Sequence, residues 1–306
     1  MWTSAITPKL ISNSVIAVPP LARDSQRKIS VLENTKIIRS LEAGGVSTLL
    51  YGGNAVFYHM RLAEYSDALA MLASAAAPNT WMVPSVGPTF GIMMDQAEIL
   101  REFDFPTVMI LPQKEVADET GIATGVRLFV EQYGKPIVLY IKHDRWLSPV
   151  LVESLVRDGL VSWIKYAVVR DNPSVDPYLK EIMSVVPANM VVSGIGEQPA
   201  IIHLRDFGVS GFTSGCVCVS PARSMAMHRA IQAKDFAKAE AIRKTFGPLE
   251  ELRNSIQPIR VLHQAVAAAG IAETGPMQPL LGELSDQQKA AIKEAVQSLT
   301  ALPLIA

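Results

Sequence analysis

The amino-acid sequence predicts an α/β fold, a (β/α)8 TIM barrel with a C-terminal helical appendage. Three observations predict this fold. Eight short aliphatic or β-branched runs alternate with longer stretches whose apolar residues recur at helical spacing. Several of these runs are apolar throughout, as expected of parallel strands that are covered on both faces. Eight such units within about 230 residues suit a barrel, whose typical length is about 250 residues.

The expected strands alternate with helices along the chain. The strands are expected over residues 14–18, 48–51, 82–86, 107–110, 137–141, 161–167, 190–193 and 211–215. Helical periodicity between them predicts helices over residues 34–43, 63–77, 96–103, 121–133, 151–158 and 178–186.

After the eighth strand the pattern becomes helical only. Helices are expected over residues 221–233, 236–253, 258–269 and 285–299, and a Gly- and Pro-rich connection over residues 270–282. The first of these helices would close the barrel. We therefore expect a barrel over residues 1–233 and a helical extension, packed on it, over residues 234–306.

An open, doubly wound sheet is the alternative architecture. Such sheets commonly bind a nucleotide at a glycine-rich turn after the first strand. Here the first strand is followed by two prolines, and no G-x-G-x-x-G motif opens a helix. These features favour the barrel.

Composition and charge narrow the class of partner. Hydrophobic residues make up 49% of the chain and charged residues 19%, so the chain can bury a large core and is not disordered. The formal net charge is -1, which gives no global attraction to nucleic acid or to an anionic membrane. We expect a small-molecule partner.

The cysteines and the N-terminal segment indicate the compartment. Cys216 and Cys218 are too few for a disulfide framework or a closed zinc site, so we expect a reducing environment and no metal. Residues 1–20 lack the uninterrupted apolar core of a signal peptide, and no apolar run approaches the roughly 18 residues of a membrane span. The expected location is cytoplasmic.

Lys165 is the leading candidate for a reactive group. Working residues of such barrels come from the C-terminal ends of the strands, and Lys165 lies in the apolar sixth strand. Burial disfavours the charged form of a lysine and leaves more free amine, the nucleophile that forms Schiff bases with carbonyl compounds. The alternative is a lysine at a strand end whose ammonium group reaches water.

Several further positions occur in a recognisable order. Tyr140 ends the fifth strand, Ile164 and Lys165 lie on the sixth, and Ser193 and Gly194 follow the seventh. With residues 211–215 and 233–239, this order resembles the dihydrodipicolinate synthase / N-acetylneuraminate lyase family of Schiff-base aldolases. The resemblance extends over nearly the whole chain, from residue 15 to residue 285.

This resemblance implies a mechanism. Lys165 would condense with the ketone of pyruvate or of a longer 2-oxo acid, Tyr140 would transfer the proton, and Gly194 would contribute to substrate binding. The iminium would serve as electron sink, so no cofactor is expected. The resemblance also implies a homotetramer, built as a dimer of dimers.

The loop after the second strand departs from the family pattern. Members of the family carry Gly-Thr-Thr-Gly-Glu there, and this chain has Gly-Gly-Asn-Ala-Val at residues 52–56. Backbone N–H groups of Gly53 and Asn54, with the Asn54 amide in place of a hydroxyl, would still bind a carboxylate. The alternative is a tight turn without a binding role.

The loop after the fourth strand departs as well, because Leu-Pro-Gln-Lys at residues 111–114 replaces the usual Pro-Tyr-Tyr. The resemblance implies a three-member proton relay in the synthases, and this chain lacks two of its members, the threonine of the loop after the second strand and the tyrosine of this loop. We therefore do not expect dihydrodipicolinate synthase activity. One hypothesis is that Lys114 enters the barrel mouth and lowers the proton affinity of Lys165 by charge repulsion. The alternative is an ion pair of Lys114 at the surface.

Two more residues are candidates for substrate binding. Arg145 lies near the place where an arginine of the synthases receives a substrate carboxylate. His59, in the loop after the second strand, would act as acid or base for a leaving group.

The sequence therefore predicts a lyase that forms a lysine Schiff base. It would cleave or form an aldol with pyruvate, or dehydrate or deaminate a hydroxy-2-oxo acid. The altered loops leave open a second class, a ligand-binding or regulatory paralogue without turnover. A third is an isomerase barrel in which Lys165 acts only through its charge.

Overall fold

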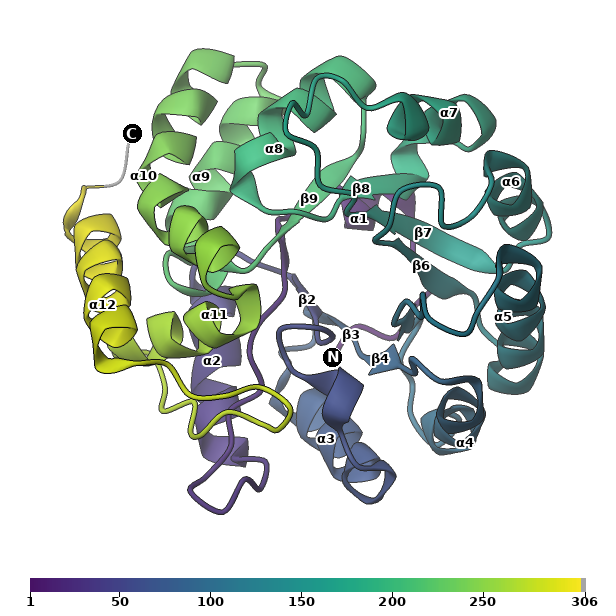
Figure 1. Ribbon diagram of the computed structural model, residues 1–306, viewed down its shortest axis with the longest axis horizontal. Helices are drawn as coiled ribbons and strands as arrows, with labels where there is room; N and C mark the ends of the chain where they lie inside the picture. The colour runs from purple at the N-terminus through teal and green to yellow at the C-terminus, as the bar shows by residue number, and fades with distance from the viewer. Residues whose placement is uncertain (304–306) are drawn as a thin grey trace.

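The strands of the computed structural model, which describes residues 1–303, form one nearly closed parallel barrel (Figure 1). Its segments are β1 (Ile16–Ala17), β2 (Thr48–Leu50), β3 (Trp81–Val83), β4 (Ser85–Val86), β5 (Met109–Ile110), β6 (Ile137–Ile141), β7 (Val161–Tyr166), β8 (Val191–Ser193) and β9 (Gly211–Ser214). Their order is β3-β2-β1-β9-β8-β7-β6-β5-β4, and every pair is parallel. The predicted α/β barrel is confirmed.

The third predicted strand is divided in two by a proline. β3 pairs with β2 and β4 pairs with β5, and only Pro84 separates the two segments. Proline has no N–H to donate to a neighbouring strand, although its carbonyl oxygen accepts a hydrogen bond from Met109 N at 2.9 Å. Nine segments therefore occupy eight strand positions.

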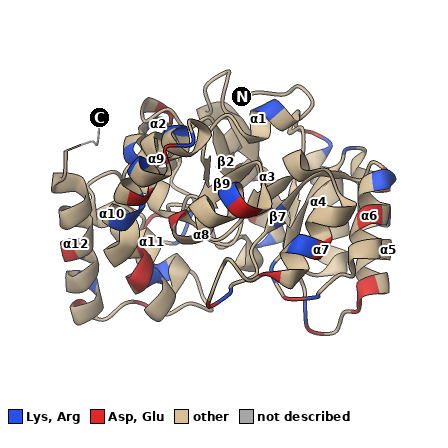
Figure 2. Cartoon of the chain, turned by 90° about the horizontal axis from the view of Figure 1, so that it is seen from above, with Lys and Arg blue, Asp and Glu red and all other residues tan. Residues whose placement is uncertain are grey.

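Helices surround the barrel. They are α1 (Pro8–Ile11), α2 (Val31–Ala43), α3 (Leu62–Ala75), α4 (Phe90–Leu100), α5 (Glu119–Tyr133), α6 (Pro149–Arg157), α7 (Pro177–Val185), α8 (Glu197–Ile202) and α9 (Pro221–Gln232). Figure 2 shows acidic and basic residue positions interspersed along these outer helices.

Local signals explain where the helices begin. The side chains of Ser30, Asp118 and Asp176 accept a hydrogen bond from a backbone N–H in the first turn of α2, α5 and α7. Prolines occupy the first position of α6, α7 and α9, where no N–H is needed.

Three helical segments differ from the sequence prediction. α4 begins at Phe90, six residues before the predicted start at residue 96. Phe90 and Ile92 in its first turn are exposed, so this turn lacks the one-sided apolar pattern of a surface helix. The short α1, and α8 with the π-helical turn His203–Phe207 that follows it, were not predicted. Each is too short for a full helical period to stand out.

The C-terminal helices are α10 (Phe236–Ser255), α11 (Pro258–Ala268) and α12 (Asp286–Ala301). α10 packs against α8 and α9, and α11 and α12 pack against α10 (Figure 1). The turn between α10 and α11 thereby lies at the mouth of the barrel. The division of the chain at residue 233 stays a prediction, and residues 304–306 of the expected extension lie outside the described residues.

The described helices include none with the length and apolar character needed to cross a bilayer.

Candidate active site

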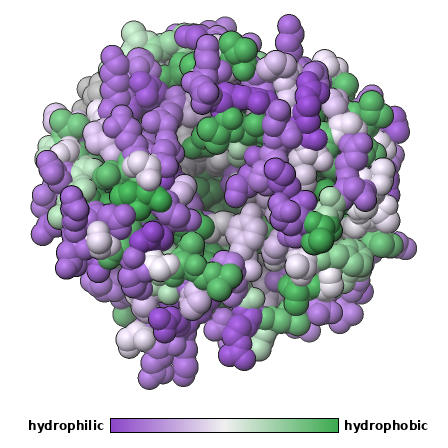
Figure 3. All heavy atoms as spheres, viewed as in Figure 1, coloured by the Kyte–Doolittle hydropathy of each residue, from purple (hydrophilic) through white to green (hydrophobic). Residues whose placement is uncertain are grey.

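A cavity of about 280 Å³ opens at the carboxyl ends of the strands. The face in Figure 3 is hollowed near its centre, where the barrel opens. The cavity is lined by the ends of the strands and by the turn between α10 and α11: Val18, Gly53, Asn54, Tyr58, Tyr140, Lys142, Lys165, Ala167, Val169, Gly194, Ile195, Gly196, Thr213, Gly215, Arg253, Asn254, Gln257, Pro258 and Ile259.

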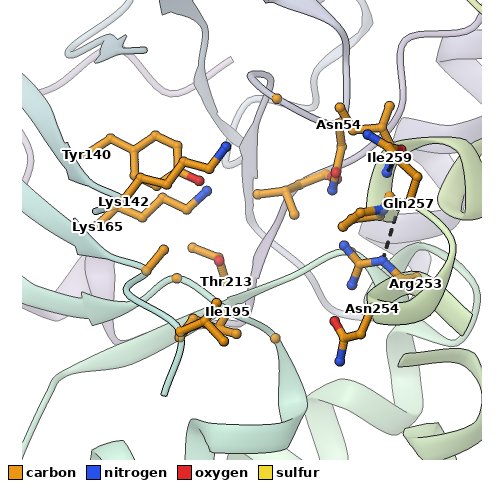
Figure 4. A pocket seen from close by; sticks show the side chains of 18 of the residues that line it. Asn54, Tyr140, Lys142, Lys165, Ile195, Thr213, Arg253, Asn254, Gln257 and Ile259 are labelled. Atoms are coloured by element: carbon orange, nitrogen blue, oxygen red, sulfur yellow. Dashed lines mark hydrogen bonds between the residues drawn. The ribbon is translucent and has the colours of Figure 1, made fainter. Parts of the chain in front are cut away.

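Lys165 extends from β7 into this cavity (Figure 4). Its side chain is 6% exposed. Among residues 1–303 it belongs to no ion pair, and its Nζ atom makes no hydrogen bond. Burial lowers the pKa of Lys165 to about 7, and the positive charges of Lys142 and Arg253 lower it further. A large fraction of this lysine is therefore free amine at neutral pH.

Tyr140 is the partner of Lys165 across parallel strands. The two residues are in register between β6 and β7, so their side chains leave the sheet side by side. The Lys165 Nζ atom lies 4.3 Å from the centroid of the Tyr140 ring. Burial raises the pKa of Tyr140 to about 12, which keeps the phenol protonated at neutral pH and able to donate a proton.

Gly194, directly after β8, leaves room for the lysine side chain. A Cβ atom at this position would lie 2.9 Å from Cγ of Lys165 and 2.7 Å from Cβ of Ala167. It would also lie 2.9 Å from the carbonyl oxygen of Tyr166. Any larger residue would displace the lysine or the strand end.

The loop after β2 lines the cavity with Gly53 and Asn54. Neither the Gly53 nor the Asn54 N–H group donates a hydrogen bond to another described residue. The Asn54 side chain is partly used in the fold, because its Nδ2 atom donates to the carbonyl oxygen of Val18 at 2.8 Å. The backbone N–H groups of Gly53 and Asn54 thus remain without a partner in the described residues, while the Asn54 amide braces the loop.

The same loop is held from the C-terminal helices. Nε2 of His263, on α11, donates to the carbonyl oxygen of Asn54 at 2.9 Å. Burial lowers the pKa of His263 to about 4, so the ring is neutral at physiological pH. A neutral ring with its proton on Nε2 holds the loop through one fixed hydrogen bond.

Solved structures of known proteins share this architecture, although no family model and no curated protein matches the sequence. Dihydrodipicolinate synthase from Oceanobacillus iheyensis superimposes with a TM-score of 0.83 at 20% identity, over 96% of this chain and 98% of that one. The sialic acid aldolase of Ruminococcus gnavus gives 0.81 at 16% identity, over 94% and 97%. A prophage protein of the dihydrodipicolinic acid synthase family from E. coli K12, in complex with pyruvate, gives 0.80 at 18% identity, over 94% and 98%.

The chain has the dihydrodipicolinate synthase fold. These likenesses confirm the architecture that the sequence resemblance implied. At such identities they do not assign an activity, which has to be argued from the side chains in the cavity.

Within the dihydrodipicolinate synthase fold of this chain, Lys165, Tyr140, Gly53, Asn54 and Gly194 all line one cavity. Sequence reasoning had placed each of them at the mouth of the barrel.

Three other candidate residues do not line the cavity, so its geometry does not support their predicted roles. Lys114 and His59 are exposed to solvent. Arg145 is exposed and forms a bidentate ion pair with Glu181, at 2.9 and 2.7 Å. A guanidinium group already paired with a carboxylate has little reason to leave it for a substrate in the cavity.

Lys142, and not Lys114 as the sequence analysis suggested, is the neighbouring lysine whose positive charge lowers the pKa of Lys165. It lines the cavity from its exposed rim, and its charge lowers the pKa of Lys165. Lys142 directly follows β6, two residues after Tyr140, and alternation continued past the strand end places both on one face. This spacing was a signal that sequence reasoning overlooked.

Tyr58, Thr213 and Arg253 were also missed. Tyr58 belongs to the short helix Phe57–His59 after β2, and the Lys142 Nζ atom lies 5.9 Å from the centroid of its ring. Arg253 reaches the cavity from α10, which packs beside the barrel. No local pattern in the sequence indicates that contact.

Proposed function

We propose that the protein is a lyase in which Lys165 forms a Schiff base with a 2-oxo acid. The observation that carries the proposal is the unpaired amine of Lys165 inside the cavity, with the Tyr140 ring 4.3 Å away. A lysine whose pKa is about 7 supplies the neutral nucleophile that this chemistry requires.

Schiff-base formation follows from the two side chains. The neutral amine attacks the ketone carbon, and an amine proton passes to the former carbonyl oxygen to give a carbinolamine. The Tyr140 phenol then protonates this hydroxyl, which leaves as water while the nitrogen lone pair forms the C=N bond. The products are a protonated iminium and a phenolate.

The iminium then accepts electrons from the substrate. In a 4-hydroxy-2-oxo acid, the Tyr140 phenolate takes the proton of the C4 hydroxyl while the C3–C4 bond breaks toward the iminium. This step releases an aldehyde and leaves an enamine. Proton return to C3 and hydrolysis of the iminium release pyruvate and restore the amine. The iminium is the electron sink, so these steps call for no cofactor.

The 2-oxo acid carboxylate would bind at the loop after β2. Gly53 and Asn54 line the same cavity as Lys165, and their N–H groups have no hydrogen-bond partner within residues 1–303. We do not propose dihydrodipicolinate synthase activity, because residues 111–114 carry no tyrosine for a proton relay. Within residues 1–303, no side chain is hydrogen-bonded to the Tyr140 hydroxyl.

That incomplete relay supports one alternative, a paralogue that binds a 2-oxo acid and does not turn it over. The two functions differ in their products. A lyase releases pyruvate from 4-hydroxy-2-oxo acids, whereas a binding protein retains the adduct and releases nothing.

Borohydride reduction in the presence of pyruvate, read by intact mass and peptide mapping, tests the proposal. The wild-type chain is expected to gain one reduced pyruvate adduct at Lys165. Lys165→Met should gain none, and Lys114→Met, which removes an exposed lysine outside the cavity, should behave as wild type. No adduct with pyruvate or with any longer 2-oxo acid would overturn the proposal, as would an adduct on another lysine.

We also propose a homotetramer, a dimer of dimers, on the strength of the sequence resemblance. Light scattering coupled to gel filtration tests it, and a monomer at micromolar concentration would contradict it.

A further inference from the structure

The cavity has a second half, on the side away from Lys165, formed by the C-terminal helices. Figure 4 shows Arg253, Asn254 and Gln257 facing Lys165 and Tyr140 from the opposite wall. The charged residues that line the cavity are Lys142, Lys165 and Arg253, and its lining includes no aspartate or glutamate. The cavity is therefore built for an anion at both ends.

Arg253 is held in place without its donors being used up. Its side chain is 9% exposed. Nε lies 3.4 Å from the carbonyl oxygen of Pro258, and Nη1 lies 3.8 Å from Sγ of Cys216, both long contacts. Nη2 makes no hydrogen bond to any residue in the described range 1–303. A guanidinium group has five N–H donors, and most of them remain for a ligand.

The end of β9 is shaped to receive this guanidinium. A Cβ atom on Gly215 would lie 2.8 Å from Nη2 and 2.9 Å from Cζ of Arg253. Only glycine lets the planar group lie this close to the strand end, with one edge directed to the cavity.

Within residues 1–303, no carboxylate forms an ion pair with Arg253. Glu197 and Glu250 are buried near it, yet neither forms an ion pair with it within the described residues. Oε1 of Glu197 accepts hydrogen bonds from Ser214 and Ser224 instead, at 2.5 and 2.8 Å. Burial raises the pKa of Glu250 to about 8, so this carboxyl group is largely uncharged at neutral pH.

A buried and unpaired guanidinium is costly unless an anion completes it. Arg145, the arginine that the sequence suggested for a substrate carboxylate, is already paired with Glu181 outside the cavity. Arg253 is left as the buried guanidinium of this site.

We propose that Arg253 binds a second carboxylate at the far end of the substrate, so that the enzyme selects 2-oxo dicarboxylic acids. This inference rests on the proposed Schiff-base function. The 2-oxo acid end would lie at Lys165 and the Gly53–Asn54 loop. The distal carboxylate would accept N–H donors from the free edge of Arg253, beside Asn254 and Gln257. A planar carboxylate suits the edge of a planar guanidinium, and a cavity of about 280 Å³ suits a small dicarboxylate.

The test compares two probes of equal chain length that differ in their far end. 2-Oxoglutarate ends in a carboxylate and 2-oxopentanoate ends in a methyl group. Each is trapped with borohydride at pH 9, where Lys165 is free amine, and its half-saturating concentration is measured. The wild-type protein is expected to require a lower concentration of 2-oxoglutarate, and the ratio of the two concentrations is the readout.

Arg253→Met should reduce this selectivity ratio by about 10- to 100-fold, the usual loss for a charge-assisted pair. Arg253→Lys keeps the charge and loses the planar guanidinium, so its selectivity ratio should lie between those of the wild type and Arg253→Met. Arg145→Met is the matched control and should leave the ratio unchanged. Because a ratio is compared, a general loss of affinity or of folded protein does not alter it.

The inference is overturned if the wild-type protein does not prefer 2-oxoglutarate. It is also overturned if Arg253→Met leaves the selectivity ratio unchanged, or if Arg145→Met lowers that ratio as much as Arg253→Met does. A preference for a phosphorylated 2-oxo acid over 2-oxoglutarate would overturn the carboxylate assignment. If Arg253→Met does not fold, the inference is tested by the wild-type preference for 2-oxoglutarate and by the selectivity ratio of Arg253→Lys. Absence of any adduct at Lys165, pyruvate included, would instead reject the Schiff-base function itself.

Discussion

Lys165 and Tyr140 are register partners on adjacent parallel strands, and the lysine Nζ atom lies 4.3 Å from the centre of the tyrosine ring. The amine contacts the ring face, while the phenol oxygen remains directed to the cavity. In the proposed mechanism, Tyr140 therefore both covers the nucleophile and carries the proton that Schiff-base formation needs. The two roles can be separated by mutation.

Tyr140→Phe keeps the ring and removes the hydroxyl. Because a positioned general acid contributes about 10²- to 10⁴-fold, we expect adduct formation with pyruvate to slow by at least about 100-fold. The amine should still react slowly, since its burial is preserved. Quenched time courses with borohydride measure the rate, and a rate equal to that of the wild type would exclude Tyr140 as proton donor.

Lys142→Met should raise the pKa of Lys165, because it removes a neighbouring positive charge. The initial rate of adduct formation in the wild type should rise with pH through a midpoint near 7. In Lys142→Met this midpoint should move upward by a few tenths of a pH unit, a modest shift because Lys142 is exposed and screened. Lys114→Met is the control. If the midpoint moves in Lys114→Met and not in Lys142→Met, then Lys114, and not Lys142, is the residue that lowers the pKa of Lys165.

Lys165→Met should stabilise the protein, most strongly at low pH. The pKa of Lys165 is about 7 in the folded chain and about 10.5 when unfolded, so between these values the unfolded state binds more protons. The wild-type free energy of unfolding therefore rises with pH over that interval, and below pH 7 the full cost of burying the ammonium applies. The advantage of Lys165→Met should be as much as a few kcal/mol at pH 6 and should shrink toward pH 10. Urea unfolding at both pH values measures it, and an advantage that grows with pH would contradict the burial of a charged amine.

Gly194→Ala should impair both folding and adduct formation. The added Cβ would overlap Lys165, Ala167 and the Tyr166 carbonyl oxygen, and a strand backbone cannot withdraw at low cost. We expect a loss of about 1–3 kcal/mol in the free energy of unfolding, together with slower trapping of pyruvate. Gly247→Ala, in α10 with open space around the position, is the matched control and should be neutral or stabilising. Equal behaviour of the two variants would show that Gly194 is not needed for the lysine.

The barrel was predictable because its signal repeats. Each strand that is buried on both faces appears as an aliphatic run, and eight such runs leave few architectures open. Pro84 was visible in the sequence, yet its effect depends on which neighbours each half-strand pairs with, and that is a tertiary property.

Those parts of the site that follow directly from a strand end were predictable, and Lys165, Tyr140 and Gly194 are the examples. Arg145, in the loop after β6, lies outside the cavity and pairs with Glu181 of α7, a contact that no local pattern reveals. Arg253 enters the cavity because α10 packs against α8 and α9 and brings the guanidinium to Gly215, directly after β9.

The hydrogen bond from His263 to the Asn54 carbonyl oxygen ties the loop after β2 to a helix more than two hundred residues later in the chain. A shortened gene product that stops where the barrel is complete would keep the reactive amine. It would lack both the brace of the loop after β2 and the guanidinium on the opposite wall. The proposed site therefore depends on the C-terminal helices as well as on the barrel, and an attempt to trim the chain to a bare barrel should begin by replacing that single imidazole contact.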